Sequence, residues 1–227
     1  MSLPQTGDYI DIHIHSGTPA QGIFILESLM AHEEKVPVDA PGIAYTYGIH
    51  PWFLDESNQK GLLAKVEKII PNADIIAIGE AGFDRLRGPS LELQSKVFES
   101  QVAWSESLSK PIVIHCVRAW DELLLVRKKM KPKMPWLVHG FRGGVEMANQ
   151  LLSKGMYLSL WFDFVLRPES SKLIRVLPHD KIFLETDGAD VNIRDIYRKV
   201  SKDLGIEVES LKGQLYTNYY NFFNLKT

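Results

Sequence analysis

The chain of 227 residues is 45% hydrophobic and 24% charged, and its net charge is −2. This is ordinary globular composition, and it gives no sign of a protein that binds nucleic acid through its overall charge. No apolar run reaches the roughly 18 residues of a membrane span, so we expect no membrane partner. The single cysteine, Cys116, excludes an internal disulfide. Because the first residues also lack a basic flank and an apolar leader pattern, the sequence predicts a cytoplasmic protein.

Short apolar, β-branched runs alternate with amphipathic stretches along the chain. The apolar runs predict strands at 9–14, 22–28, 43–49, 75–79, 111–115, 135–139, 156–160 and 181–185. The amphipathic stretches predict helices at 58–70, 91–109, 119–130, 143–154, 168–177, 192–204 and 207–223. Prolines follow the first, second and fifth of these helices, as expected for a residue that cannot continue a helix.

Eight strands mostly separated by helices predict a (β/α)8 TIM barrel, with residues 1–227 as a single domain. Continuous apolar runs fit parallel strands that are buried on both faces. Residues 15–21 are too short for a crossover helix, and residues 29–42 hold at most one helical turn. We therefore expect a somewhat distorted barrel, shortened between its first three strands. A doubly wound open sheet is the alternative.

Histidines and acids collect at the carboxyl ends of these predicted strands. The segment DIHIH, residues 11–15, places two histidines on one strand face because side chains alternate along a strand. Catalytic groups of a (β/α)8 barrel come from this end, and histidines that merely satisfy core polarity would not be sorted to it. The sequence therefore predicts a metal centre with the ligands His13, His15, Glu80, His115, His139 and Asp187.

This donor set contains imidazoles and carboxylates but no thiolate. It suits Zn²⁺ or Mn²⁺, and Mg²⁺ remains possible only where imidazole is not the ligand. Six ligands are too many for one open catalytic zinc, which keeps three protein ligands and a water. Two divalent ions about 3.5–4 Å apart fit better, because such a pair activates a water and clamps the oxygens of an in-line displacement.

Six motifs of the chain, in this order, resemble those of the TatD-like metal-dependent deoxyribonucleases, a family of amidohydrolase-like barrels. The motifs are DIHIHS, GIHPW, GEAGFD, KPIVIHCVRAWDE, HGFRGG and ETD. The resemblance implies one ion on His13, His15, Asp187 and a bridging Glu80, and a second ion on Glu80, His115 and His139. Two motifs depart from the family pattern: Ala189 stands where ETDxP has proline, and HGFRGG replaces HCFSG. The chain is also short after the first strand, which leaves the substrate open.

Two acids are predicted to take part in the reaction. Asp187 is the candidate general base, which would take the proton of the activated water. Glu80 follows Gly79, whose backbone freedom would allow a tight turn at the strand end. Glu185 shares a strand face with Asp187, and both a hydrogen bond to a ligand histidine and simple barrel packing suit it.

Candidate substrate residues follow the same strand ends. His50 is predicted to contact a substrate phosphate, with a structural role beside Pro51 as the alternative. Arg118 and Arg142 each follow a ligand histidine by three residues and are candidate phosphate clamps, because guanidinium pairs bidentately with phosphate. A surface ion pair is the alternative for both.

Weaker candidates stand nearby. Arg85 and Arg87 follow the fourth strand and are less favoured versions of the same clamp. For Trp52, Trp120 and Trp161, packing between barrel and loops is favoured over stacking on a base.

The densest positive charge of the chain, VRKKMKPK at 126–133, is predicted to lie away from the site. It ends the helix after the fifth strand, so it belongs to the amino-terminal face of the barrel, and cations are favoured at a helix carboxyl end. The sequence thus predicts a metal-dependent hydrolase with two divalent ions, acting on DNA or a nucleotide phosphodiester. The alternatives are an amidohydrolase or esterase on a small molecule and a non-catalytic binding module.

Overall fold

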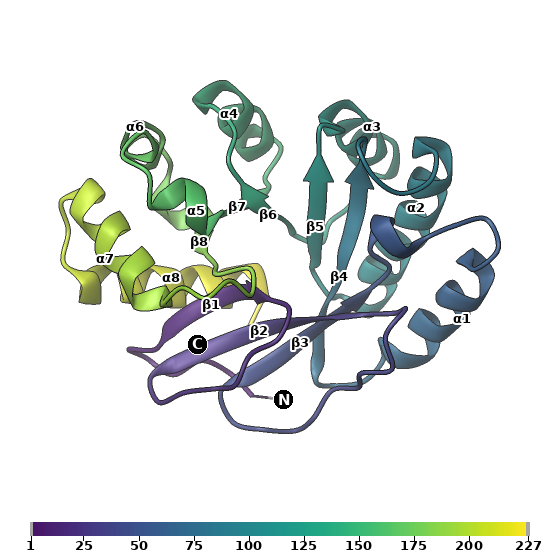
Figure 1. Cartoon of the computed structure of the whole chain (residues 1–227), viewed down its shortest axis with the longest axis horizontal. Helices are drawn as coiled ribbons and strands as arrows, with labels where there is room; N and C mark the ends of the chain where they lie inside the picture. The colour runs from purple at the N-terminus through teal and green to yellow at the C-terminus, as the bar shows by residue number, and fades with distance from the viewer. Residues whose placement is uncertain (1, 226–227) are drawn as a thin grey trace. The chain divides into compact units, whose positions relative to one another are not determined.

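A computed structural model describes residues 2–225, in which strands and helices alternate (Figure 1). The strands are β1 (Tyr9–Ile14), β2 (Ile23–Met30), β3 (Ile43–Gly48), β4 (Ile75–Asp84), β5 (Ile112–Val117), β6 (Trp136–Phe141), β7 (Tyr157–Leu160) and β8 (Ile182–Leu184). The helices are η1 (Pro51–Phe53), α1 (Gln59–Ile69), α2 (Leu91–Leu108), α3 (Trp120–Met130), α4 (Val145–Ser153), α5 (Phe162–Val165), α6 (Ser170–Ile174), η2 (His179–Lys181), α7 (Ile193–Leu204) and α8 (Val208–Phe222).

The strands form a sheet in the order β1 to β8, so each strand neighbours the next one along the chain. The pairs β1–β2, β3–β4, β4–β5 and β7–β8 are parallel. This order is that of a (β/α)8 barrel and confirms the predicted fold class. It excludes the doubly wound sheet, whose strand order reverses at a switch point. Residues 15–22 and 31–42 contain no helix, so the predicted shortening after β1 and β2 is also confirmed.

Contacts group the chain into two compact units. The first unit comprises residues 28–39 and 44–137, and the second comprises residues 2–27, 40–43 and 138–227, of which the structure describes those up to 225. That residues 1–227 form a single domain stays a prediction.

In the first unit, α2 covers β4. Its apolar residues Val97, Phe98 and Val102 are fully buried or nearly so, and Phe98 packs edge-to-face on Phe83 of β4. The helix begins after Ser90, whose hydroxyl accepts a hydrogen bond from the backbone N–H of Leu93. Burial of this apolar face fixes the helix against the strand that carries Glu80.

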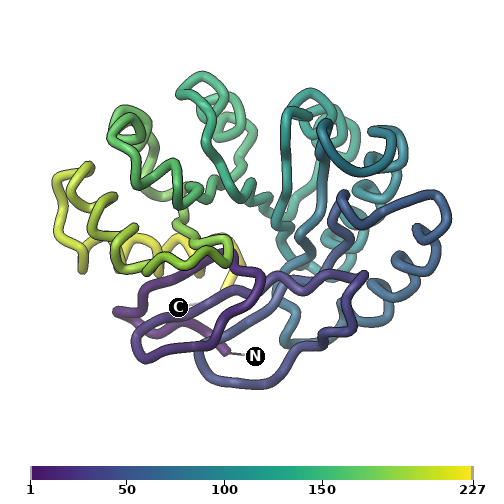
Figure 2. Tube along the Cα trace, in the orientation of Figure 1, coloured from purple at the N-terminus to yellow at the C-terminus, as the bar shows by residue number. Residues whose placement is uncertain are grey.

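In the second unit, the carboxyl-terminal helices pack on the first strand, and Figure 2 shows the yellow end of the chain beside its purple start. The Tyr197 hydroxyl of α7 accepts a hydrogen bond from the backbone N–H of Ile10 and donates one to its carbonyl oxygen. Asn218 of α8 donates to the carbonyl oxygen of Ile182 in β8. These bonds tie α7 and α8 to the strands that hold His13 and precede Asp187.

β4 is longer than the sequence predicts and does not end at Gly79. It continues to Asp84, with a register shift between Ile78 and Ala81 in its pairing with β5. A Cβ atom at Gly82 would lie 2.2 Å from the His115 carbonyl oxygen, so only glycine lets β4 approach β5 this closely. Glu80 therefore stands inside a strand instead of at a turn.

Further boundaries differ from those predicted. β5 and β6 each run two residues past their histidines, to Val117 and Phe141. The helix predicted at 168–177 is shorter, as α6, and is preceded by the unpredicted α5. Pro168 separates the two helices because its nitrogen has no hydrogen to donate to the helix.

Candidate metal-binding site

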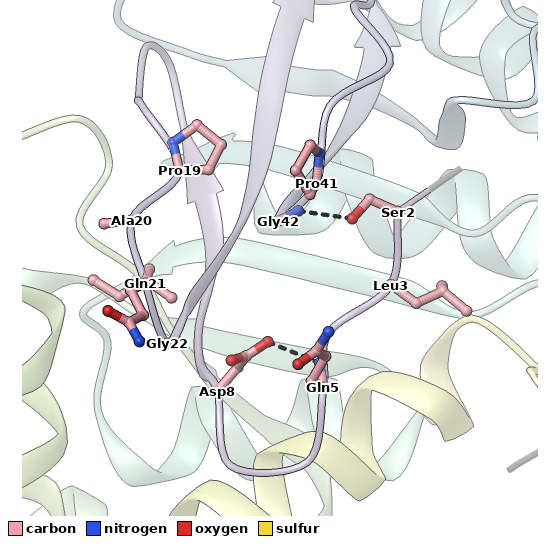
Figure 3. Close-up of a pocket in the computed structure, with 11 residues that line it drawn as sticks. Ser2, Leu3, Gln5, Asp8, Pro19, Ala20, Gln21, Gly22, Pro41 and Gly42 are labelled. Carbon is pink, nitrogen blue, oxygen red and sulfur yellow. Dashed lines mark hydrogen bonds between the residues drawn. The ribbon is translucent and has the colours of Figure 1, made fainter.

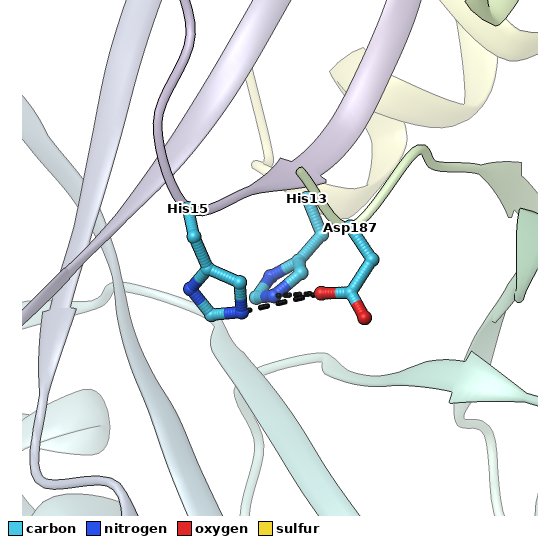
Figure 4. Close-up of side chains that lie close together, drawn as sticks. All are labelled: His13, His15 and Asp187. Atoms are coloured by element: carbon cyan, nitrogen blue, oxygen red, sulfur yellow. Dashed lines mark ion pairs between the residues drawn. The ribbon is translucent and has the colours of Figure 1, made fainter. Parts of the chain in front are cut away.

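In the second unit, His13, His15 and Asp187 point toward one another (Figure 4). Asp187 Oδ1 lies 3.5 Å from His13 Nε2 and 3.2 Å from His15 Nε2. One ligand atom from each residue lies within 4.8 Å of the others, a spacing that a single metal ion can span. Two imidazoles and a carboxylate thus converge where β1 and β8 end.

The backbone geometry determines where these three side chains lie. His13 lies in β1, and His15 directly follows Ile14, the last residue of that strand, so both side chains stand where β1 ends. The backbone N–H of Asp187 donates to the carbonyl oxygen of His13 at 3.1 Å, which places the carboxylate beside both rings. Asp187 has a φ of 54°, a left-handed conformation that aspartate adopts more readily than most residues.

Burial alone would raise the pKa of Asp187, but hydrogen bonds from His13 and His15 and the charge of His139 outweigh burial and hold it well below the ordinary range. The carboxylate is therefore ionised at neutral pH. An anion between imidazoles is the electrostatic environment that a divalent cation requires.

A buried carboxylate, Asp11 of β1, supports the segment that carries Asp187. Its side chain accepts hydrogen bonds from the Thr186 hydroxyl at 2.6 Å and the Thr186 backbone N–H at 3.0 Å. Burial raises the pKa of Asp11 to about 7, although these hydrogen bonds oppose the shift. Asp11 holds the residue that directly precedes Asp187.

His139 lies in the same unit and stacks on His13, with 3.9 Å between ring centroids. Glu185 is fully buried, and its Oε1 accepts a hydrogen bond from the backbone N–H of Gly140 at 2.6 Å. The same oxygen is 3.8 Å from His139 Nδ1, which is too long for a hydrogen bond. Glu185 therefore fixes the β6 backbone next to His139 more directly than it fixes the imidazole.

In the first unit, Glu80 is buried between two histidines. Its Oε1 lies 2.8 Å from His115 Nδ1 and 3.0 Å from His50 Nε2. Glu80, His115 and His50 are 1%, 8% and 3% exposed, so all three side chains are removed from bulk water. Their ligand atoms also lie within 4.8 Å of one another.

His50 lies inside this group and not on an exposed rim. Its Nδ1 accepts a hydrogen bond from the backbone N–H of Trp52 at 3.1 Å. A neutral imidazole that accepts at Nδ1 carries its hydrogen on Nε2, so Nε2 donates to Glu80. The arrangement orients the Glu80 carboxylate.

Asp84 is a site residue that the sequence analysis missed. Its Oδ2 lies 3.0 Å from His115 Nε2 and accepts from Trp52 Nε1 at 2.6 Å. Burial would raise the pKa of Asp84, but the hydrogen bonds from His115 and Trp52 outweigh it and lower the pKa to about 2. A carboxylate that contacts one nitrogen of a histidine fixes the ring and increases the basicity of the other nitrogen. The signal was present in GEAGFD, where Asp84 follows Glu80 by four residues along one strand.

The candidate arginines differ in their surroundings. Arg118 is exposed, and none of residues 2–225 forms an ion pair or hydrogen bond with its guanidinium. The Arg142 guanidinium stacks on Trp161, 4.1 Å from the ring centroid. Arg85 pairs with Glu122, whereas Arg87 stacks on Trp52. Three of these four cations thus have no carboxylate partner among the described residues.

The donors of both groups fit a divalent metal. They are imidazole nitrogens and carboxylate oxygens, which suit Zn²⁺ or Mn²⁺. Cys116 does not belong to them: burial raises the pKa of its thiol far above the ordinary range, so the thiol stays protonated.

A cavity of about 370 Å³ in the second unit is separate from these residues (Figure 3). It lies where β1, β2 and β3 begin, whereas His13 and His15 lie where β1 ends. Its lining includes Ser2, Leu3, Gln5, Asp8, Pro19, Gly22 and Gly42. Asp8 is the one ionisable side chain in this lining, and it accepts a hydrogen bond from the Gln5 backbone N–H.

The strand order is that of a (β/α)8 barrel, and the grouped histidines and acids form a candidate metal site. Residues 26–224 match the family described as TatD related DNase, and the chain belongs to this family. Among residues 2–225, no helix combines the length and apolarity needed to cross a membrane.

Individual relatives agree with this assignment. An "uncharacterized metal-dependent hydrolase" of Buchnera aphidicola is 30% identical over 146 residues, or 62% of this chain and 54% of that protein. A "3'-5' ssDNA/RNA exonuclease TatD" of Erwinia billingiae is 29% identical over 187 residues, or 80% of this chain and 70% of the exonuclease. A TatD family hydrolase from Entamoeba histolytica has the same fold, with a TM-score of 0.76 at 18% identity, over 96% of this chain and 98% of that one.

Proposed function

We propose that this protein is a divalent-metal-dependent phosphodiesterase that hydrolyses single-stranded DNA or RNA. The observation that carries the proposal is the pairing of carboxylates with histidines, the partly exposed Asp187 with His13 and His15 and the buried Glu80 with His115. The exonuclease name of the Erwinia relative supports a nucleic-acid substrate. A cytoplasmic location stays a prediction, and it fits such a substrate.

Two divalent ions fit the number of ligands. His13, His15 and Asp187 would hold one, and Glu80 and His115 would contribute to the other. The ligand role of His139 stays a prediction from its position at a strand end, and the bridging role of Glu80 stays a prediction from the family resemblance. When bound, the ions would supply Lewis-acid polarisation of the phosphodiester and a lower pKa for an attacking water.

The side chains of the chain have distinct tasks in this proposal. Asp187 is ionised and accepts the proton of the attacking water. His50 donates to Glu80 and keeps its carboxylate oriented, while Asp84 fixes the His115 ring from its Nε2 side. Pre-set orientation of this kind costs no reorganisation during the reaction.

Two exposed cations complete the proposal. Arg118 and Arg142 would bind non-bridging phosphate oxygens, since neither is neutralised by a carboxylate among the described residues. Such groups favour a phosphodiester over a neutral amide or ester, because phosphate offers two oxygens to a guanidinium.

The test is a substrate panel with metal-loaded protein. A single-stranded oligonucleotide and bis(p-nitrophenyl) phosphate should both be hydrolysed, and dipeptide, lactone and dihydropyrimidine substrates should not. Turnover of an amide or ester with both phosphodiesters inert would replace the proposal with a small-molecule amidohydrolase or esterase. Failure of every substrate would favour a binding protein.

A further inference from the structure

An arginine and a tryptophan stack beside the Glu80 group in the first unit. The Arg87 guanidinium carbon lies 4.0 Å from the centroid of the Trp52 ring, within the range of a cation–π contact. Trp52 follows β3 and Arg87 follows β4, so both stand at the strand ends that lead away from the buried core. The pair joins two loops that are far apart in the sequence.

Both members of the pair are held in place by the backbone and by Asp84. Trp52 Nε1 donates to Asp84 Oδ2 at 2.6 Å, and the backbone N–H of Arg87 donates to Asp84 Oδ1 at 3.0 Å. A Cβ atom at Gly88 would lie 2.5 Å from the Pro51 carbonyl oxygen, and Gly88 has a φ of 95°. Only glycine therefore allows the Arg87 loop to lie this close to η1.

The Arg87 guanidinium is available to bind an anionic ligand. Among residues 2–225, no acid pairs with its guanidinium, whereas Arg85 of the same loop is paired with Glu122. No described residue accepts a hydrogen bond from this guanidinium, so its N–H donors are available, and they match two phosphate oxygens. Leu86 is 65% exposed and Trp52 is 37% exposed, so apolar surface adjoins the cation.

We propose that Arg87 and Trp52 form a subsite for a phosphate that flanks the scissile one in a single-stranded nucleic acid. Arg87 binds the flanking phosphate, and the exposed parts of Leu86 and Trp52 contact the adjoining nucleoside. Asp84 links the subsite to the reaction, because the same carboxylate oxygen contacts Trp52 Nε1 and His115 Nε2. The inference rests on the proposed function, since it presumes a nucleic-acid substrate.

The test compares two substrates that differ in flanking phosphates. A single-stranded oligonucleotide has them, and bis(p-nitrophenyl) phosphate has none. Arg87→Ala should lower kcat/KM on the oligonucleotide about tenfold, mainly through KM, and leave bis(p-nitrophenyl) phosphate hydrolysis unchanged. Arg87→Lys should recover part of the loss, because it restores the charge but not the planar fork.

A control variant and a binding measurement separate the subsite from general effects. Arg198→Ala removes an exposed arginine that pairs with Asp195 on α7, and it should change neither substrate. Oligonucleotide affinity of metal-free protein gives a readout without turnover. Its salt dependence, the slope of log K against log salt, should be shallower by about 0.7 in Arg87→Ala, the value for one phosphate contact on a single strand.

Each outcome is decisive. Normal kcat/KM and salt dependence in Arg87→Ala would overturn the subsite while the proposed function stands. An equal loss on both substrates would also overturn it, because Arg87 would then act on the scissile phosphate or on the fold. A wild-type protein that hydrolyses neither phosphodiester would refute the proposed function, and the subsite with it.

Discussion

Asp187 is the residue on which the proposed chemistry depends most. In Asp187→Asn the amide cannot accept the proton of the attacking water, and one anionic ligand is lost. Turnover of a metal-loaded sample should fall at least ~100-fold, the lower range for a lost general base. The thermal melting curve should stay close to that of the wild type, because the side chain is partly exposed. Near-normal turnover with metal bound would show that Asp187 is not the base.

For single residues, a position at a strand end could be predicted from the sequence, but the side-chain contacts around it could not. His13, His15 and Asp187 were predicted together because they stand at strand ends, and the structure places them side by side. Asp84 was missed, since its contacts with His115 and Trp52 depend on how far β4 continues past Gly79. Propensity and periodicity do not report that length.

At the scale of strands and helices, two glycine substitutions test how closely β4 approaches β5. Gly82 lies at that contact, and Gly213 of α8 serves as the control. In Gly82→Ala the new Cβ would meet the His115 carbonyl oxygen at 2.2 Å, and φ there is 142°. We expect a loss of more than about 3 kcal/mol in the free energy of unfolding, because two backbones must separate. A Cβ atom at Gly213 of α8 would meet nothing within 4 Å, so Gly213→Ala should instead stabilise by about 0.5–1 kcal/mol.

Urea denaturation of both glycine variants measures these effects. Equal stabilities for Gly82→Ala and wild type would mean that β4 and β5 do not approach each other as described. Destabilisation by Gly213→Ala would contradict the open surface found beside α8.

The basic carboxyl end of α3 allows a test of which end of the strands binds the substrate. Lys129 pairs with Glu99, and Arg127 stacks on Trp136, the first residue of β6, which precedes His139 by three residues. Neutralising Lys128, Lys129, Lys131 and Lys133 together should change kcat/KM on a short oligonucleotide less than about threefold, roughly 0.6 kcal/mol in the barrier. Arg118→Ala and Arg142→Ala should each lower it substantially more.

The assay for this comparison is steady-state hydrolysis of one oligonucleotide by all three variants. If the quadruple lysine variant lost most of its activity and both arginine variants stayed fully active, the substrate would bind near the end of α3. That result would contradict the predicted position of the substrate. The location of this segment was predictable from strand order alone. The Arg127–Trp136 contact was not, because it depends on side-chain packing between a helix end and the next strand.

For the whole molecule, the strand pattern was sufficient to predict the fold class. Eight apolar runs fell on eight strands, and the links after β1 and β2 lack helices as expected. Substrate choice was less accessible from the sequence, because the subsite that we propose lies in the loop of residues 85–89, where Arg87 contacts Trp52. The conformation of this loop follows from local contacts, such as that between Gly88 and Pro51, that leave no periodic pattern in the sequence.

The most direct test of the central claim measures bound metal and oligonucleotide hydrolysis in the same samples. Protein is stripped with a chelator and reloaded in steps with Mn²⁺ or Zn²⁺, and each step is analysed for metal content and for turnover of single-stranded DNA. We predict that stripped protein is inactive and that activity returns as about two ions bind per chain, the number that six ligands suit. Full hydrolysis by protein that holds no metal, or a fully loaded protein that cleaves no strand, would contradict the account.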